Sequence, residues 1–202
     1  MKQTLMFATN NSHKLEEIRS ILPDYEVLGL KDIGLDYDIP ETGSTLEENA
    51  WIKANFLFNH MGLDSLSEDT GLEVFCLDGA PGVHTARYAG DDKNPESNIN
   101  KLLNQMLHSD DRKARFRTVI AYVTKTRVNY FEGIVNGKIA LVKSGNGGFG
   151  YDPIFIPDGY EKTFADLDPE IKNTISHRAN AVNKLIEFLK IDNSLQQEIK
   201  NK

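Results

Sequence analysis

The order of apolar and polar residues divides the chain into strands and helices. Six segments combine β-branched or aromatic residues with the near-alternating pattern of half-buried strands. These segments are residues 3–9, 25–30, 72–77, 116–123, 129–135 and 137–143. Other segments repeat apolar residues every three or four positions, which is the spacing of an amphipathic helix. These segments are residues 14–22, 44–61, 95–106 and 176–189, with a further short helix expected from Asp168.

Polar residues and glycines mark where these helices begin and end. Ser44 and Glu47 form a capping-box pattern, Gly62 ends the same helix, and Ser176 is expected to cap the last one. Strands and helices alternate first, and three strands then follow in succession, two of them expected as a hairpin. This order predicts an α/β fold with a mixed sheet. We expect a single domain over residues 1–191, followed by a polar tail at residues 192–202.

Composition narrows the class of protein. The chain has 202 residues, of which 40% are apolar, and this suits one domain, with or without a division into two lobes. Its apolar runs are shorter than the about 20 residues of a membrane span, and no signal-peptide pattern is present. The single cysteine, Cys76, fits a reducing compartment, so we expect a cytoplasmic protein in which Cys76 is a small buried apolar residue. The net charge of −7 argues against binding to nucleic acid polymers.

The stretch GNGGFGYDPIF, residues 145–155, places four glycines beside two aromatic residues. Its G-x-G-x-x-G spacing fits a dinucleotide-binding loop only if a helix begins inside it. Pro153 disfavours helical geometry at Asp152, so this interpretation is excluded. A P-loop is excluded as well, because no Lys-Ser or Lys-Thr pair follows the last glycine.

Further polar patches are expected in loops at strand ends, where open α/β sheets bind ligands. Residues 9–14, TNNSHK, place hydroxyl and amide groups and a lysine at a helix start, which suits a phosphate. Residues 67–71, SEDTG, place two adjacent carboxylates where a hard cation such as Mg²⁺ is expected. Glu41 precedes a helix on which Glu48 and Lys53 are expected to lie near one face.

Two more patches lie at residues 79–88 and 176–178. The rigid turn in GAPGVHTARY, residues 79–88, leads to Arg87, which is expected to pair with a carboxylate inside the fold. His177 and Arg178 follow the cap of the last helix and are expected to project into a cleft. Each patch also has an ordinary structural interpretation, as a helix cap, a surface i,i+4 pair or an exposed acidic turn. Taken singly, the patches leave these alternatives open.

Together, six segments resemble the inosine triphosphate pyrophosphatase family, in the same order along the chain. The shared patterns are T-N-N-x-x-K, E-T-G-x-T-x-x-E-N-A-x-x-K-A, D-T-G-L-x-V, G-A-P-G-V-x-x-A-R-Y, G-G-F-G-Y-D-P-x-F and I-S-H-R. They extend over nearly the whole chain. The family usually has two aspartates before the Thr-Gly pair, and Glu68 replaces the first of them here. Because of that difference, Asp69 is expected to have the larger part in metal binding.

The resemblance implies an elongated α/β fold with the active cleft between two lobes, a homodimer, and Mg²⁺-dependent cleavage of ITP, dITP and XTP to the monophosphate and pyrophosphate. It implies that Asp69 is the base that activates water, with metal-bound water as the alternative. Glu41, Glu68 and Asp69 are the expected metal ligands. The residues expected to bind substrate are Thr9, Asn10, Asn11, Ser12, His13, Lys14, Lys53 and Thr70 for the phosphates, and Phe149, Gly150, Tyr151, Asp152, Lys172, His177 and Arg178 for the base.

The expected chemistry of the base site follows from donors and flat rings. Phe149 or Tyr151 offers a face on which a purine stacks, and the glycines leave room for the main chain to approach the base. Donors on Lys172, His177 and Arg178 favour the C6 oxygen of hypoxanthine over the amino group of adenine. Two alternatives remain: a Maf-like pyrophosphatase that prefers pyrimidines, and a nucleotide-binding protein without turnover.

Overall fold

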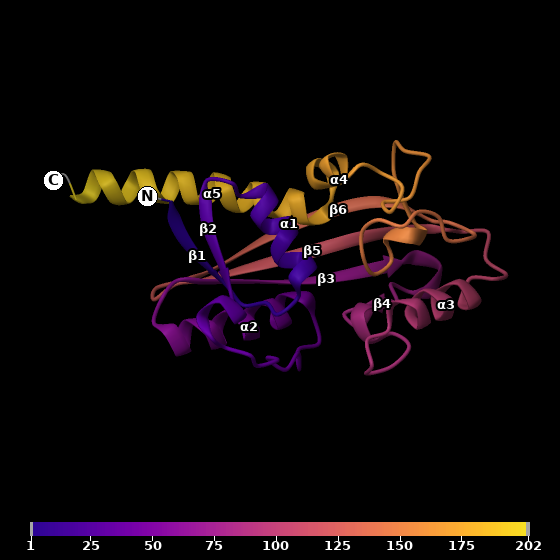
Figure 1. Ribbon diagram of the computed structural model, residues 1–202, viewed down its shortest axis with the longest axis horizontal. Coiled ribbons are helices and arrows are strands. Elements are labelled where there is room, and N and C mark those ends of the chain that lie inside the picture. The colour runs from indigo at the N-terminus through magenta and orange to yellow at the C-terminus, as the bar shows by residue number, and fades with distance from the viewer. Residues whose placement is uncertain (1, 201–202) are drawn as a thin grey trace.

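A computed structural model describes residues 2–200 of the protein (Figure 1). The strands are β1 Gln3–Phe7, β2 Tyr25–Gly29, β3 Ser65–Val74, β4 Pro81–Gly82, β5 Lys113–Val123, β6 Val128–Ile139 and β7 Phe155–Pro157. The α-helices are α1 Ser12–Ile21, α2 Leu46–Met61, α3 Pro95–Gln105, α4 Pro169–Ile175 and α5 His177–Lys200. The predicted α/β class is confirmed.

One seven-stranded sheet contains all of these strands, in the order β2-β1-β3-β5-β6-β7 with β4 paired to β3. β1 is parallel to β2 and β3, and the other neighbours are antiparallel, so the predicted mixed sheet is confirmed. β5 and β6 form the predicted hairpin. The long strands β3, β5 and β6 extend through the molecule, and the shorter strands attach to them near either end (Figure 1).

The edge of β3 is shared by two different strands. β1 pairs with β3 only as far as Leu66, and β4 pairs with it only from Leu72 onward. Within the described chain, residues 67–71 of β3 therefore pair with β5 alone. A gap opens along this edge, and side chains on both faces of β3 border it, because successive residues of a strand point to opposite faces.

Helices cover both faces of the sheet. α1 and α5 pack on one face, where Ile120 and Leu185 belong to the same apolar cluster. α2 packs on the other face, with Ala54 against Ala121 (Figure 1). A second large cluster lies at the other end of the long strands and includes Leu102 of α3. Two clusters at opposite ends of the strands are compatible with two lobes, and that division stays a prediction.

Several strand boundaries differ from the sequence prediction. β3 extends from Ser65 to Val74, so residues 67–71 lie inside a strand and their predicted position in a loop is wrong. The segment predicted as a strand at residues 72–77 ends in a 3-10 turn in which Cys76 is only half-buried. β6 continues through Gly137 to Ile139, although a strand break is predicted beside this glycine. A Cβ at Gly137 would meet the Ile156 carbonyl oxygen at 2.2 Å, so glycine is required there. That glycine serves close packing of β7 and does not separate two strands.

The start of α2 is shifted by one residue from its predicted position. Thr45 is the N-cap, and its Oγ1 accepts a hydrogen bond from Glu48 N at 3.1 Å. Glu48 Oε2 in turn accepts hydrogen bonds from Ser44 N and Oγ. The predicted pair of Ser44 and Glu47 is therefore wrong in register, although the capping chemistry is the one expected.

The predicted helix boundaries at Gly62 and Ser176 agree with the structure, whereas the last helix extends beyond its predicted end at residue 189. Gly62 ends α2 with a φ of 67°, and Ser176 Oγ accepts a hydrogen bond from Ala179 N at 3.1 Å. α5 runs to Lys200, so the backbone of the predicted polar tail is helical up to that residue, and residues 201–202 lie outside the described part. No helix in the described part is long and apolar enough to cross a membrane.

Candidate active site

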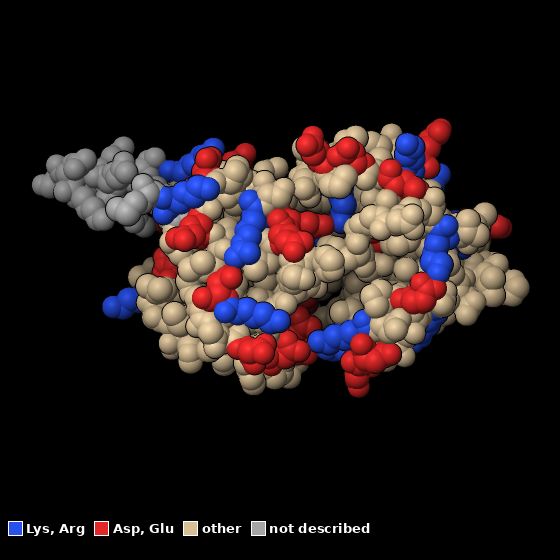
Figure 2. All heavy atoms as spheres, in the orientation of Figure 1, with Lys and Arg blue, Asp and Glu red and all other residues tan. Residues whose placement is uncertain are grey.

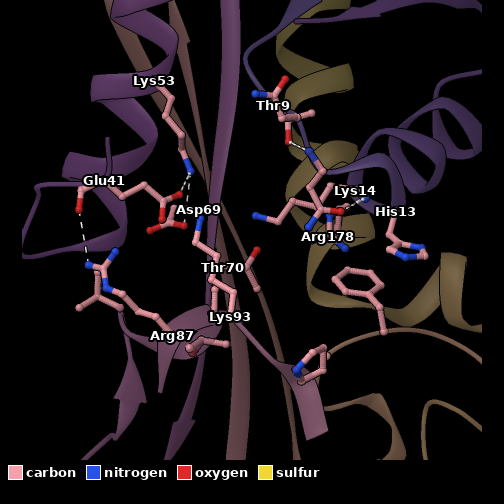
Figure 3. Close-up of a pocket in the computed structure, with 18 of the residues that line it drawn as sticks. Thr9, His13, Lys14, Glu41, Lys53, Asp69, Thr70, Arg87, Lys93 and Arg178 are labelled. Atoms are coloured by element: carbon pink, nitrogen blue, oxygen red, sulfur yellow. Dashed lines mark hydrogen bonds and ion pairs between the residues drawn. The ribbon is translucent and has the colours of Figure 1, made fainter. Parts of the chain in front are cut away.

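A pocket of about 670 Å³ opens at the gap along the β3 edge. Its walls come from the loop after β1, from α1, α2, β3 and β5, from the glycine-rich loop, and from α4 and α5 (Figure 3). The space-filling view shows a hollow near the middle of the molecule, with acidic and basic side chains around it (Figure 2). Every predicted site residue lines this pocket except Ser12 and Glu68. The volume is that of an ordinary small-molecule site.

One end of the pocket is built around a buried lysine. Lys53 Nζ lies 2.6 Å from Glu41 Oε1 and 3.5 Å from Asp69 Oδ1. Asn49 Nδ2 donates to Asp69 Oδ2 at 3.1 Å, and Asn49 Oδ1 accepts from Gly43 N at 2.8 Å. Asn49 therefore joins Asp69 to the loop that carries Glu41. Asn49 and Lys53 share a helix face because they are one turn apart.

The environment of Asp69 suits a proton acceptor. Burial raises the pKa of Asp69, and the charge of Glu41 adds to this shift, while Lys53 and Lys14 oppose it. Burial alone would lower the pKa of Lys53, but the charges of Asp69 and Glu41 outweigh burial and raise that pKa. Lys53 therefore stays charged beside a carboxylate whose affinity for a proton is higher than in water.

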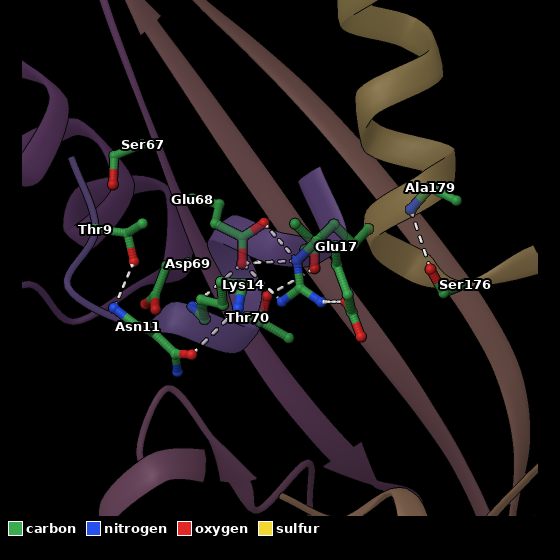
Figure 4. Close-up of polar contacts among 12 residues, drawn as sticks. Thr9, Asn11, Lys14, Glu17, Ser67, Glu68, Asp69, Thr70, Ser176 and Ala179 are labelled. Atoms are coloured by element: carbon green, nitrogen blue, oxygen red, sulfur yellow. Dashed lines mark hydrogen bonds and ion pairs between the residues drawn. The ribbon is translucent and has the colours of Figure 1, made fainter. Parts of the chain in front are cut away.

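Glu68 has a different environment, since it lies on the opposite face of β3 (Figure 4). The Arg178 guanidinium donates to both of its carboxylate oxygens, and Lys14 Nζ lies 3.3 Å from Glu68 Oε1. Burial would raise the pKa of Glu68, but the charges of Arg178 and Lys14 outweigh it and hold the pKa at about 2. Glu68 is thus a paired anion inside the fold, and it does not line the pocket.

Arg178 and Lys172 share a second carboxylate, Glu17 of α1. Glu17 accepts from Lys172 Nζ at 2.7 Å and also from Arg178 Nη1. Lys172 Nζ lies 2.7 Å from Asp152 Oδ2 as well. Three of the five N–H groups of Arg178 therefore face Glu17 and Glu68, which leaves fewer donors for a ligand than the sequence suggests.

The other end of the pocket contains Phe149 and the glycine-rich loop. Asp152 Oδ2 accepts a hydrogen bond from Phe149 N at 2.7 Å, which fixes the loop. A Cβ at Gly148 would lie 2.1 Å from the same oxygen, so glycine is needed there for the loop and not for approach to a base. Tyr151 is 3% exposed and its hydroxyl donates to Thr85 O, which leaves Phe149 as the aromatic residue available for stacking.

His177 contributes a polar atom that has no partner inside the described structure. The side chain is 4% exposed, its ring stacks on Phe116 at a centroid distance of 4.6 Å, and Nδ1 makes no hydrogen bond. Burial lowers the pKa of His177 well below its usual value, and the charges of Arg178 and Lys172 add to this shift. A neutral imidazole beside the pocket, with an unsatisfied nitrogen, indicates a polar ligand.

The polar groups of the loop after β1 form two sets of hydrogen bonds, one that caps α1 and one to the segment before α2. Thr9 Oγ1 accepts from Asn11 N at 3.2 Å, and Asn11 Oδ1 accepts from Lys14 N as the N-cap of α1. Asn10 Nδ2 donates to Tyr37 O at 2.8 Å, which ties this loop to the segment before α2. The predicted helix cap is therefore present, and it holds Lys14 at the pocket wall.

Several predictions about neighbouring residues are wrong, and several residues were missed. Glu48 is exposed and does not share a face with Lys53. Arg87 forms no ion pair among the described residues; it lines the pocket with Nη2 3.5 Å from Glu41 O. The predicted site residues do not include Asn49 or Glu17, although the i,i+4 spacing of Asn49 and Lys53 was a usable signal. Other pocket residues that the prediction missed include Lys93, Asn98 and Phe116.

The carboxylates of the pocket fit a hard cation only in part. Among the described residues, no group of three His, Cys, Asp or Glu side chains is close enough to hold a metal ion alone. Glu41 and Asp69 both contact Lys53 Nζ and so lie near one another (Figure 3). One or two carboxylates completed by phosphate oxygens is the usual Mg²⁺ environment in nucleotide enzymes. The pair therefore fits a cation that arrives with a triphosphate.

The fold and this pocket define an α/β protein with a small-molecule site beside a mixed sheet. The Ham1 family profile matches residues 5–188, and the chain belongs to this family. The solved structure of the Staphylococcus aureus Ham1 protein aligns with a TM-score of 0.85 at 43% identity, over 94% of this chain and all of that one. A HAM1 protein from Coxiella burnetii aligns with a TM-score of 0.84 at 38% identity, over 93% of this chain and 98% of that one.

Curated relatives are similar over nearly their whole length. A protein of Christiangramia forsetii named dITP/XTP pyrophosphatase is 53% identical over 92% of this chain and 98% of its own. A protein of Porphyromonas gingivalis with the same name is 52% identical over 93% of this chain and 97% of its own.

Proposed function

We propose that this protein hydrolyses deaminated purine nucleoside triphosphates, such as dITP, XTP and ITP, to the monophosphate and pyrophosphate. The observation that carries the proposal is one pocket with two chemically different ends. Asp69 and Glu41 surround Lys53 at one end, and Phe149 and the buried His177 line the pocket as well. The dITP/XTP pyrophosphatase names of relatives with 53% and 52% identity support the same substrate class here.

The reaction uses Asp69 as the proton acceptor. Asp69 takes a proton from a water molecule while the water oxygen forms a bond to the α-phosphorus. The bond between that phosphorus and the bridging oxygen breaks, and pyrophosphate leaves with the bridging oxygen. The raised pKa of Asp69 favours the proton transfer, and Asn49 holds the carboxylate in position. Glu41 and Asp69 would hold Mg²⁺ together with the substrate, and the ion would supply charge neutralisation for the triphosphate.

The phosphates lie between the loop after β1 and α2. Lys14 and Lys53 supply positive charge there, and Thr70 supplies a hydroxyl. Glu68 binds Arg178 and Lys14 and takes no part in metal binding in this proposal. Arg87 and Lys93 border the same region and add to the positive charge that a triphosphate requires.

The base lies on Phe149 with its C6 oxygen toward Lys172 and His177. Both side chains are at most 5% exposed and offer polar atoms to the pocket. An adenine amino group there would leave buried donors unpaired, at a cost of about 1–3 kcal/mol each. Rejection of ATP follows from this mismatch, while guanine shares the C6 oxygen and is rejected less strongly.

The family resemblance adds a homodimer and a cytoplasmic location to the proposal. The single cysteine and the net charge of −7 are in keeping with a protein that acts on small molecules in a reducing compartment.

Turnover of four nucleotides tests the function. The protein is incubated with ITP, XTP, ATP and UTP in the presence of Mg²⁺, and pyrophosphate and orthophosphate are measured separately. We expect pyrophosphate from ITP and XTP, with kcat/KM at least ~100-fold above that for ATP. In ¹⁸O-labelled water the label is expected in the monophosphate. Preference for UTP would favour the Maf-like alternative, and binding without turnover would favour a nucleotide-binding protein.

A further inference from the structure

His13, in the first turn of α1, stacks on Phe149 of the glycine-rich loop. The ring centroids are 5.3 Å apart and the ring planes differ by 12°. Both residues line the pocket, His13 is exposed and Phe149 is half-buried, so the pair lies at the pocket mouth. The contact joins two segments that are far apart in sequence and that the proposed function places at opposite ends of the substrate.

The direction of His13 separates it from its neighbours in the TNNSHK loop. Lys14 Nζ reaches toward Glu68 in β3, whereas the imidazole of His13 lies against the ring of Phe149. The cations nearest that ring are Lys172 Nζ at 5.0 Å and Arg178 Cζ at 5.6 Å from its centre. His13 thus lies with the groups assigned to the base, although the sequence resemblance assigns it to the phosphates.

A base that stacks on the face of Phe149 that His13 covers must displace the His13 ring. Stacked rings lie about 4.5–7 Å apart centre to centre, so His13 already occupies a position that a stacked base would take. Among the described residues, the imidazole makes no hydrogen bond or ion pair, and only the stack holds it. Rotation about its own side-chain bonds therefore moves it outward without breaking a polar contact.

We propose that His13 is the movable second wall of the nucleobase site, which moves off Phe149 when a base enters and stacks on the outer face of the bound base. This inference rests on the proposed function. It assigns His13 to the same site as a residue that contacts the face of the base and forms no hydrogen bond with its edge. Stacking depends on the flat face that all bases share. His13 therefore strengthens binding of every purine equally and leaves discrimination to Lys172 and His177.

The protein also contains a similar stacked His–Phe pair that lies outside the pocket. His60 stacks on Phe56 with centroids 6.1 Å apart and planes 8° apart, and neither residue lines the pocket. His60→Ala is therefore a matched control for loss of an exposed imidazole from a phenylalanine ring.

The test compares His13→Ala, His13→Phe and His60→Ala with the unmutated protein. The measurements are kcat and KM for ITP and ATP with Mg²⁺, inhibition by pyrophosphate, and binding of inosine monophosphate by calorimetry. In His13→Ala we expect KM for ITP and the dissociation constant of inosine monophosphate to rise about 5- to 100-fold, the range of one stacking contact. The kcat value, the ITP/ATP ratio and inhibition by pyrophosphate stay within about twofold. His13→Phe restores KM, and His60→Ala changes none of these values.

Two results would overturn the inference. Unchanged KM and unchanged monophosphate binding in His13→Ala would show that the stack is a surface contact like that of His60. A parallel loss of inhibition by pyrophosphate would assign His13 to the phosphates. An unmutated protein that neither cleaves ITP nor binds inosine monophosphate would instead contradict the proposed function itself.

Discussion

Asp69 is buried, lies beside the cation Lys53 and is held in a fixed orientation by Asn49. We therefore expect catalysis to depend on its charge more than on its volume. Asp69→Asn keeps the shape and removes the proton acceptor. We expect kcat for ITP to fall at least ~100-fold, with little change in thermal unfolding. A variant that keeps more than about a tenth of the activity would remove Asp69 from the role of base. Glu68→Ala would then be the next variant to measure.

Asn49 is 0% exposed and acts on the reaction only through Asp69 and Gly43. Asn49→Asp keeps the acceptor for Gly43 N but replaces the donor to Asp69 with a second negative charge. The pKa of Asp69 is already raised by burial, and a like charge raises it further. We therefore expect the acidic limb of the kcat/KM profile to move to higher pH and the Mg²⁺ requirement to change. Asn49→Ala, which adds no charge, controls for structural loss, and an acidic limb that does not move would contradict the positioning role.

At the scale of elements, the contact between β6 and α5 positions the base-binding residues. A Cβ at Gly133 would lie 2.0 Å from the His177 carbonyl oxygen and 2.4 Å from Ala181 N. Only glycine lets the first turn of α5 lie so close to the strand. His177 and Arg178 are in that turn, so a small displacement of the helix moves both.

Gly133→Ala is expected to push the start of α5 away from β6. Overpacking of this kind costs about 1–3 kcal/mol of the free energy of unfolding. We also expect KM for ITP to rise while inhibition by pyrophosphate changes little. Gly137→Ala is the matched control, because its Cβ would meet Ile156 O at 2.2 Å, next to β7 and not α5. Equal effects of both variants on KM would contradict the link between Gly133 and the base site.

At the scale of the whole molecule, a buried network of charges connects β3, α1, α4, α5 and the glycine-rich loop. Glu68 pairs with Arg178, Arg178 and Lys172 pair with Glu17, and Lys172 pairs with Asp152. Each member is at least half-buried, so loss of one charge leaves its partner without compensation.

The network is expected to make the protein sensitive to acid. The pKa of Glu68 is lowered from 4.5 to about 2, because Arg178 and Lys14 outweigh the effect of burial. A lowered pKa stabilises the folded state above pH 4.5, and this contribution is lost as the pH falls toward 2. It amounts to roughly 3 kcal/mol at neutral pH.

Urea unfolding between pH 7 and pH 3 measures this contribution. We expect the free energy of unfolding to decrease below about pH 5, and Glu68→Gln to be less stable at pH 7 and to show a shallower decrease. Parallel curves for the two proteins would mean that other carboxylates control acid unfolding.

Much of the architecture could be predicted from the sequence, because local patterns specify it. Alternation gave β1, β2 and β5, three- and four-residue spacing gave the helices, and Gly62 and Ser176 marked ends that the structure confirms. One error in the strands occurred where a glycine has a tertiary reason. At Gly137 a neighbouring backbone comes close, and no local pattern distinguishes that use of glycine from a strand break.

The sequence by itself determined the order of the main elements, the family resemblance and most of the polar residues that gather at the pocket, since these depend on residue type and spacing. Only the tertiary structure decided how those residues are paired. Glu68 and Asp69 are adjacent in the chain, yet strand geometry sends one to Arg178 and the other to Lys53. His13 and Lys14 likewise diverge to Phe149 and Glu68. Partners from distant elements meet through packing, and packing depends on the whole chain rather than on any short segment of it.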